Sequence, residues 1–409
     1  MNIPKKQLRE GRLKALQKVK KEKIRKKGLV GLSSVIVLCI GFIFSVQQSP
    51  TFASFAAKIP GLNTLVELIQ GNEGIRDAVD NNYYEELGLM QSKDGKTVTL
   101  HGAIIDEYNV FLNYDFDFTK KVANHNHYNI EILQAGKLIM EGSSSRGTMD
   151  DIDGPVSHSK HKFEMHLLKP IDRELLDFKV IITFYDGTIL EFPFTLKNPL
   201  AKTKVTKANK EVNVNGQRFT ILEIRRTPLR VAIDIKENPN NSMKILSYEG
   251  MAIHLNTGNQ RKPIMNGLTS FQSEDQTSTT YLFQSNYFYE ANEMVIIFDE
   301  IMAVPKDDHF IEIDFVTNEV LYVPDYIDWD ISIHNNEVTI KTKTSEARQY
   351  VMYAIKENGS RLDSGNFQLY TDGEFKTTFS DYKGKAKLII HYFDNPIGEN
   401  VEVPIILQH

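Results

Sequence analysis

The segment from Gly28 to Val46 contains no charged residue and is dominated by apolar residues over its nineteen positions. An α-helix rises about 1.5 Å per residue, so a helix of this length reaches roughly 28 Å, close to the ~30 Å hydrocarbon core of a bilayer. The pattern therefore predicts a membrane-spanning helix over 28–46.

A strongly basic tail, residues 1–27, precedes this run. It contains twelve Lys or Arg residues against Glu10 and Glu22, a net charge of +10. Because positive flanks stay on the cytoplasmic side, we expect the tail inside the cell and everything after the span outside. The tail can also contact anionic lipid as a weak amphipathic helix, or bind a cytoplasmic partner.

Three alternatives to a permanent anchor are a lipoprotein, a cleaved signal peptide and a buried core helix. A lipoprotein needs small residues just before its cysteine, whereas Cys39 follows Val37 and Leu38 in the middle of the run. A cleaved signal peptide could use the TFA motif at residues 51–53, but the basic region and the apolar run are both longer than signal peptides have. A buried core helix has no need of so asymmetric a charge distribution. The anchored reading is therefore kept.

Residues 47–88 have the spacing of short helices rather than of strands. Leu62, Leu65, Val66 and Ile69 recur at helical intervals, and a second short helix is predicted over 74–84. We interpret 47–88 as a helical linker region.

From residue 89 onward, apolar and polar positions alternate with a period of two, the pattern of half-buried strands. Gly95–Phe116 aligns without gaps to Gly216–Glu237, an offset of 121 residues, and each stretch predicts a strand, a turn and a second strand. Val338–Lys343 and Tyr350–Ile355 have the same two-strand rhythm with a different turn. The chain beyond the linker therefore contains an internal repeat.

The repeated units end alike, in a strand, a turn and a final strand that contains or precedes Pro193, Pro324 or Pro404. These ends predict three domains, over 89–200, 201–325 and 326–409. Short strands separated by turns at this spacing are typical of antiparallel β-sandwiches of immunoglobulin-like type. The expected fold is mainly β, with tandem sandwiches after one transmembrane helix and a helical linker.

Charge and cysteine content narrow the partners of the outer region. The whole chain carries a net charge of −5, so the part after the tail carries −15, which argues against nucleic acid as its ligand. The only cysteine, Cys39, lies within the predicted span, so no disulfide is expected outside. Domains of this size can bury enough apolar surface without such cross-links.

No group of residues in the sequence predicts a catalytic, metal or cofactor site. His125 and His127, with the nearby His158, His161 and His166, have the residue types of metal ligands but no established ligand spacing. Asp150, Asp151 and Asp153 lack the spacing and closing Glu of a calcium loop. The segment 142–147 (GSSSRG) lacks the strand–turn–helix setting of a nucleophile elbow. We therefore expect no enzyme activity.

The segments SPTFA (49–53) and IPGLNTLVELI (59–69), followed by Asn72, Gly74 and Ile75 and by Asn82 and Tyr84, resemble a domain family of undefined activity from Bacillus-type bacteria. The resemblance runs to about Pro199 and more weakly to about Pro324. It implies one N-terminal span followed by β-rich extracytoplasmic domains. Some members carry a cytoplasmic zinc-binding anti-sigma module and act as negative effectors of sigma factors; the tail of this chain has neither Cys nor His.

The expected function is that of a membrane-anchored extracytoplasmic binding or sensing protein, with a regulatory, anti-sigma-like role implied by the resemblance. Its expected partners are the lipid bilayer, through the span and the tail, and an envelope protein or wall ligand outside. The alternative is a structural or adhesive wall-associated protein whose β-domains act mainly as spacers.

Overall fold

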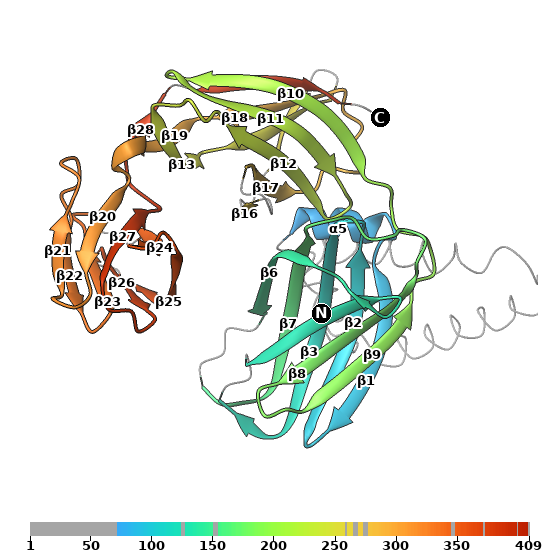
Figure 1. Ribbon diagram of the computed structural model, residues 1–409. Coiled ribbons are helices and arrows are strands. Elements are labelled where there is room, and N and C mark those ends of the chain that lie inside the picture. Colours follow the sequence, from blue (N-terminus) through green and yellow to red (C-terminus); the bar gives the residue numbers. More distant parts are fainter. Residues whose placement is uncertain are drawn as a thin grey trace, which may run out of the picture. The chain divides into compact units, whose positions relative to one another are not determined.

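Figure 1 shows the computed structural model of the chain. It describes residues 72–407 except 124–126, 150–153, 258–259, 265–268, 273–276, 345–347, 371–372 and 399. The predicted tail, span and first linker helix lie outside this part, within which no helix is long and apolar enough to cross a membrane. The described part is mainly β and divides near Leu200 into two compact units, each considered by itself.

The described part begins with helix α5 (Glu73–Asp80), which has a sequence-encoded start. Asn72 is its N-cap, and the Asn72 side chain accepts a hydrogen bond from the backbone N–H of Ile75 at 3.1 Å. The sequence predicted this helix over 74–84, but it ends at Asp80. Asn82 has a φ of +64°, a left-handed conformation that an α-helix excludes.

Domain 1 is a β-sandwich of two antiparallel sheets, with strand orders β1-β2-β3-β7-β6 and β5-β4-β8-β9. Leu112 and Phe163 from the first sheet and Val180 from the second meet in one buried core. The strands are β1 (Glu85–Lys93), β2 (Lys96–Ile105), β3 (Asn109–Val122), β4 (Tyr128–Gln134), β5 (Lys137–Leu138), β6 (Glu141–Thr148), β7 (Val156–Leu167), β8 (Asp177–Phe184) and β9 (Ile189–Thr195).

Domain 2 has the same architecture, with sheet orders β10-β11-β12-β17-β16 and β15-β14-β18-β29, and a small additional sheet β13-β19-β28. Its core includes Phe219, Ile233 and Ile296. The strands are β10 (Lys204–Val214), β11 (Gln217–Arg226), β12 (Arg230–Glu237), β13 (Met243–Glu249), β14 (Ala252–Thr257), β15 (Gln260–Ile264), β16 (Thr269–Gln272), β17 (Thr279–Gln284), β18 (Glu293–Phe298), β19 (Glu300–Pro305), β28 (Pro396–Ile397) and β29 (Val401–Ile406).

The predicted repeat between domains 1 and 2 is confirmed down to the strand register. The offset of 121 residues carries the bounds of β2 onto those of β11, and the first residue of β3 onto that of β12. It also carries the irregularity in the β2–β3 ladder, between Leu100 and Gly102, onto the one between Ile221 and Glu223. A bulge bends and twists its strand, so the two domains share backbone geometry as well as hydrophobic pattern.

The C-terminal strand belongs to domain 2, which differs from the expected division at residue 325. β29 pairs antiparallel with β18, with Val403 opposite Ile296, as β9 pairs with β8 in domain 1. Val403 and Ile405 accordingly lie in the domain 2 core. Domain 1 joins its last two strands by a tight turn at Gly187 (φ +84°), whereas domain 2 inserts a whole domain between them.

Domain 3 is this insertion, and the chain enters it from β19 and returns through β28, which pairs with β19. Its eight strands follow the order β21-β20-β27-β24-β25-β26-β23-β22 and enclose their own core. The elements are η1 (Lys306–Asp308), β20 (Phe310–Asp314), β21 (Glu319–Tyr322), β22 (Asp330–His334), β23 (Glu337–Lys341), β24 (Val351–Lys356), β25 (Arg361–Leu369), β26 (Glu374–Phe379) and β27 (Lys385–Ile390).

The third copy of the two-strand rhythm does not form a hairpin. β23 and β24 are both strands, as predicted, but β23 pairs with β22 and β26, whereas β24 pairs with β25 and β27. The alternating pattern identifies a strand from local burial, and the choice of partner depends on the rest of the domain.

Candidate functional site

The histidines near β7 do not converge on one point. His158 is exposed on the outer face of the first domain 1 sheet, whereas His161 is fully buried on the inner face. His166 is buried at the end of the strand, where its Nδ1 lies 2.8 Å from Asn109 Oδ1. His127 packs against the Tyr185 ring, and His125 and the Asp150–Asp153 cluster lie outside the described residues.

His161 belongs to a buried polar cluster in the domain 1 core. Its Nε2 lies 2.7 Å from Ser159 Oγ and its Nδ1 lies 3.3 Å from Tyr128 Oη, which in turn lies 2.7 Å from Tyr114 Oη. Burial raises the pKa of both tyrosines. A Ser–His pair enclosed in this way has no opening toward a substrate, and we assign the cluster a packing role.

Two His–Asp pairs lie on the outer face of the same sheet. His101 Nε2 is 2.9 Å from Asp115 Oδ2, and His158 Nδ1 is 2.9 Å from Asp117 Oδ1. Asp115 and Asp117 alternate with the buried Phe116 along β3, as the sequence predicted for a half-buried strand. Within the described residues, no group of three or more His, Cys, Asp or Glu side chains is placed to hold a metal ion.

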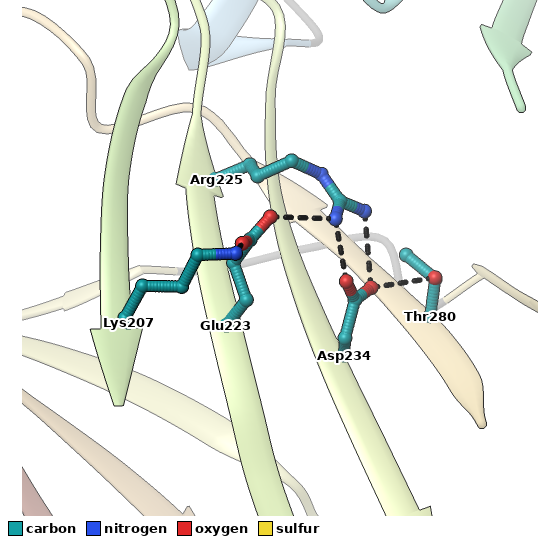
Figure 2. Close-up of polar contacts among 5 residues, drawn as sticks. All are labelled: Lys207, Glu223, Arg225, Asp234 and Thr280. Atoms are coloured by element: carbon teal, nitrogen blue, oxygen red, sulfur yellow. Dashed lines mark hydrogen bonds and ion pairs between the residues drawn. The ribbon is translucent and has the colours of Figure 1, made fainter. Parts of the chain in front are cut away.

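The equivalent face of domain 2 carries the charged network in Figure 2. Arg225 forms a bidentate ion pair with Asp234, at 2.5 Å and 3.0 Å, and also donates to Glu223 at 3.0 Å. Lys207 pairs with Glu223, and Thr280 donates to Asp234 at 2.7 Å. The charges of the two cations and two anions cancel, so the network itself is neutral.

At the equivalent positions, domain 1 has uncharged residues in place of the two carboxylates of the domain 2 network. Gly102 stands where domain 2 has Glu223, and Asn113 stands where it has Asp234. The Tyr84 ring lies over Gly102, so that a Cβ on Gly102 would come within 2.3 Å of the ring, and the Tyr84 hydroxyl donates to Asn113 Oδ1 at 2.9 Å. In both domains these positions join strands of one sheet, which indicates a structural role.

A hollow of about 480 Å³ at one end of domain 3 is the best candidate for ligand binding. We call it the domain 3 pocket. Four segments that flank strands meet there: the approach to β22, the exit from β23, the approach to β24 and the exit from β27. Its lining residues are Asp328, Trp329, Thr342, Lys343, Thr344, Arg348, Tyr350, Tyr392, Phe393 and Asp394.

Aromatic rings form the apolar part of the pocket. The Trp329 ring lies 4.8 Å from the Tyr350 ring and 5.7 Å from the Phe393 ring, and the Tyr350 and Tyr392 rings are 6.2 Å apart. Tyr350 is only 3% exposed, while Trp329, Tyr392 and Phe393 are half-buried and pack against the domain 3 core. The rings of Trp329, Tyr392 and Phe393 therefore pack against the core on one side and keep part of their surface accessible to a ligand.

The rim of the pocket is charged but balanced. Lys343 Nζ lies 2.7 Å from Asp328 Oδ2, and this ion pair holds the pKa of the Asp328 carboxyl below its ordinary value. The Arg348 guanidinium lies over the Tyr392 ring, 5.6 Å from its centre. Partial burial, with the nearby Asp394 carboxylate, raises the pKa of the Tyr392 hydroxyl.

The wall behind the rings is fixed by hydrogen bonds. The Thr342 hydroxyl lies 2.9 Å from Tyr350 Oη, 2.9 Å from Thr344 Oγ1 and 3.3 Å from the carbonyl of Gly373. Gly373 has a φ of +80°, and a Cβ there would lie 2.1 Å from the Thr344 carbonyl oxygen, so only glycine fits. The pocket is thus largely pre-formed, as small-molecule sites usually are.

The sequence indicated none of these pocket residues. Trp329 is the single tryptophan of the chain, and no motif around it predicts a site. The available signal was the position of the aromatic residues: Trp329, Tyr392 and Phe393 lie in connecting segments, where large apolar side chains are less expected than in strands.

Comparison with known families gives two matches of undefined function. Residues 20–117 match a domain of unknown function (DUF4179), and residues 203–333 match a family of unknown function (DUF5643). No curated protein sequence matches the chain.

Two solved structures illustrate the distant similarities of the chain to known folds. A conserved domain protein from Bacillus anthracis is 11% identical, with a TM-score of 0.40 over 80% of this chain and 93% of its own. A cycloalternan-forming enzyme from Listeria monocytogenes, solved with a pentasaccharide substrate, is 10% identical, with a TM-score of 0.16 over 70% of this chain and 29% of its own. Likenesses of this strength contribute nothing to the assignment of function.

Proposed function

We propose that this chain is a membrane-anchored extracytoplasmic binding protein whose ligand occupies the domain 3 pocket. The observation that carries the proposal is the combination, in one pre-formed hollow, of half-buried aromatic rings with a charged rim. Binding sites are typically concave and mostly apolar, with a few placed polar groups. The anchoring part of the proposal rests on the sequence, through the uncharged run 28–46 and the +10 tail before it.

As part of this proposal, the chain binds its ligand and does not turn it over. The buried Ser159–His161 pair is closed to solvent, and the two His–Asp pairs of domain 1 and the Arg225 network of domain 2 are ion-paired groups. The pocket itself holds carboxylates and cations on its exposed rim, where they interact with each other or with a ring. Such groups orient a ligand and do not by themselves supply a nucleophile with an adjacent base.

The binding role is tested with a soluble digest of cell envelope added to the full chain in detergent. The chain has one tryptophan, Trp329, so its emission reports on the pocket directly. We expect a saturable change in emission that Tyr392→Ala weakens and Tyr370→Ala, in the same domain but outside the pocket, leaves unchanged. An emission spectrum unaffected by any fraction of the digest contradicts the proposal.

A structural or adhesive role is the second candidate, and the repeat favours it. Domain 2 duplicates domain 1 in strand order and bulge position, as expected of modules that serve as spacers. Deletion of domain 1 distinguishes the two roles in cells. A spacer role predicts that the phenotype of the cells changes when domain 1 is deleted. A binding role predicts that the phenotype changes when the domain 3 pocket is altered.

The regulatory role implied by family resemblance needs its own test. If a sigma factor is controlled by this chain, deletion of the gene should change transcription of one sigma-dependent set of promoters. Restoration by the wild-type chain, but not by a pocket variant, would connect that output to ligand binding.

A further inference from the structure

We infer that the ligand of the domain 3 pocket is a neutral saccharide, an inference that rests on the proposed function and names its ligand class. A sugar ring has two kinds of surface: faces of C–H groups and an edge of hydroxyls. The residues that line the pocket supply a complement to each: the aromatic rings of Trp329, Tyr392 and Phe393, and hydrogen-bonding groups on the rim.

The aromatic rings suit the faces of a sugar ring. The π-faces of Trp, Tyr and Phe carry partial negative charge, which attracts the weakly positive C–H groups of a pyranose. Trp329 and Phe393 are half-buried neighbours whose ring centres lie 5.7 Å apart at an angle of 53°. Both are supported by the domain core, so little side-chain entropy is lost when a ligand stacks on them.

The charge balance of the rim argues for a neutral ligand. Asp328 and Asp394 contribute two negative charges, and Lys343 and Arg348 contribute two positive charges. A pocket for a phosphate or a uronic acid would carry an excess of cations, and one for a polyamine would carry an excess of carboxylates. The balanced rim gives neither class a net attraction.

The mixture of donors and acceptors matches hydroxyl groups. Each sugar hydroxyl both donates and accepts, so it can use the Asp394 carboxylate, the Lys343 ammonium and the Thr344 hydroxyl in turn. A volume of about 480 Å³ lies within the usual range of ligand pockets, roughly 300–1,000 Å³. Short oligosaccharides fit these dimensions and this chemistry together.

A proline-rich peptide is the main rival, because such peptides dock on aromatic-lined grooves. It presents few hydrogen-bond donors, since proline has no N–H, and so offers little to the carboxylates of the rim. The number of polar groups around the pocket therefore favours the saccharide.

The test follows Trp329 emission of the full chain in a non-glycosidic detergent. The probes are tetrasaccharides of N-acetylglucosamine, of α-1,4-linked glucose and of β-1,4-linked glucose, with tetragalacturonate as the anionic comparison and a proline-rich decapeptide as the rival. We expect saturable binding of at least one neutral tetrasaccharide. Tyr392→Ala should weaken it about tenfold or more, as loss of an aromatic anchor does, and Tyr370→Ala should leave it unchanged.

The set of outcomes distinguishes failure of the saccharide inference from failure of the proposed function. Asp394→Ala, at an exposed rim position, serves as a second pocket variant if Tyr392→Ala lowers the melting temperature of the protein. Binding of the peptide or of tetragalacturonate alone overturns the saccharide inference and leaves a binding role standing. Response to the envelope digest but to none of the neutral probes also overturns it. No response to any probe or to the digest overturns both.

Discussion

Ile405→Ala is the sharpest test of the inserted arrangement, because the sequence and the structure assign this residue to different domains. Ile405 lies in β29, is 4% exposed and belongs to the domain 2 core. The neighbouring Ile406 is 71% exposed on the same strand and provides a matched control.

The size of the effect follows from the burial of the side chain. Replacing Ile405 by alanine removes three carbon atoms, worth about 2.4 kcal/mol of transfer free energy at ~0.8 kcal/mol each. The cavity left in a packed core adds to this, and comparable substitutions cost about 2–5 kcal/mol. We therefore expect the free energy of unfolding of domain 2 to fall by about 3–4 kcal/mol, and Ile406→Ala to change it by less than about 0.5 kcal/mol.

Hydrogen exchange read by mass spectrometry locates the loss, and tryptophan emission in denaturant reports separately on domain 3. Peptides from β11 and β12 should exchange faster in Ile405→Ala, whereas the Trp329 transition should move little. Faster exchange confined to the strands β22–β27, with β11 and β12 unchanged, would refute the placement of β29 in domain 2.

Three further predictions concern other parts of the chain. Gly102→Ala should lower the melting temperature of domain 1 and cost about 1–3 kcal/mol, because its Cβ would meet the Tyr84 ring, whereas Gly147→Ala, with its nearest atom at 3.7 Å, should be tolerated. At Glu223, burial raises the pKa of the carboxyl, but the hydrogen bonds from Lys207 and Arg225 outweigh it and the net pKa lies below the ordinary 4.5. Its ionised form therefore stabilises domain 2 above about pH 4.5, and this contribution is lost as the pH falls through the lower folded-state pKa; acid titration of unfolding should show a smaller loss in Glu223→Gln. Finally, protease added to intact protoplasts should digest the region after the predicted span and spare the tail, and protection of the C-terminal domains would contradict the predicted topology.

The strands of domains 1 and 2 could be predicted because their signal is local. In β3, Phe116 and Phe118 alternate with Asp115 and Asp117, and that alternation alone states which side chains face the core. The gapless alignment also carried information about geometry, since the same offset preserves the bulge. Period-two burial and turn residues such as Gly216 (φ +82°) act over a few residues and are readable without a fold.

The end of helix α5 was not predictable from the local sequence pattern, which extended the helix to residue 84. The helix begins at Glu73, one residue before the predicted start, and Asn72 is its N-cap. Its end is set by the left-handed Asn82 and by the start of β1, which are consequences of the strand pairing that follows.

The sequence pattern did not predict which strands pair with each other. The segments ending in Pro193 and Pro404 look alike, and both prove to be last strands of a sandwich. The sequence placed the second of them in domain 3 because it follows domain 3 along the chain. Nothing in the alternation of β29 says that its partner, β18, lies more than a hundred residues earlier.

Periodicity and turn residues were enough to predict that this chain is mainly β after its basic tail and uncharged run, where its repeated strands begin and end, and which of their faces are buried. The tertiary structure alone decided that domain 3 interrupts domain 2 and that Trp329, Tyr350, Tyr392 and Phe393 meet in one pocket. The physical reason is the range of the interactions. Backbone conformation and burial pattern depend on neighbours along the chain, whereas strand partners and pockets depend on the packing of segments that are distant in sequence.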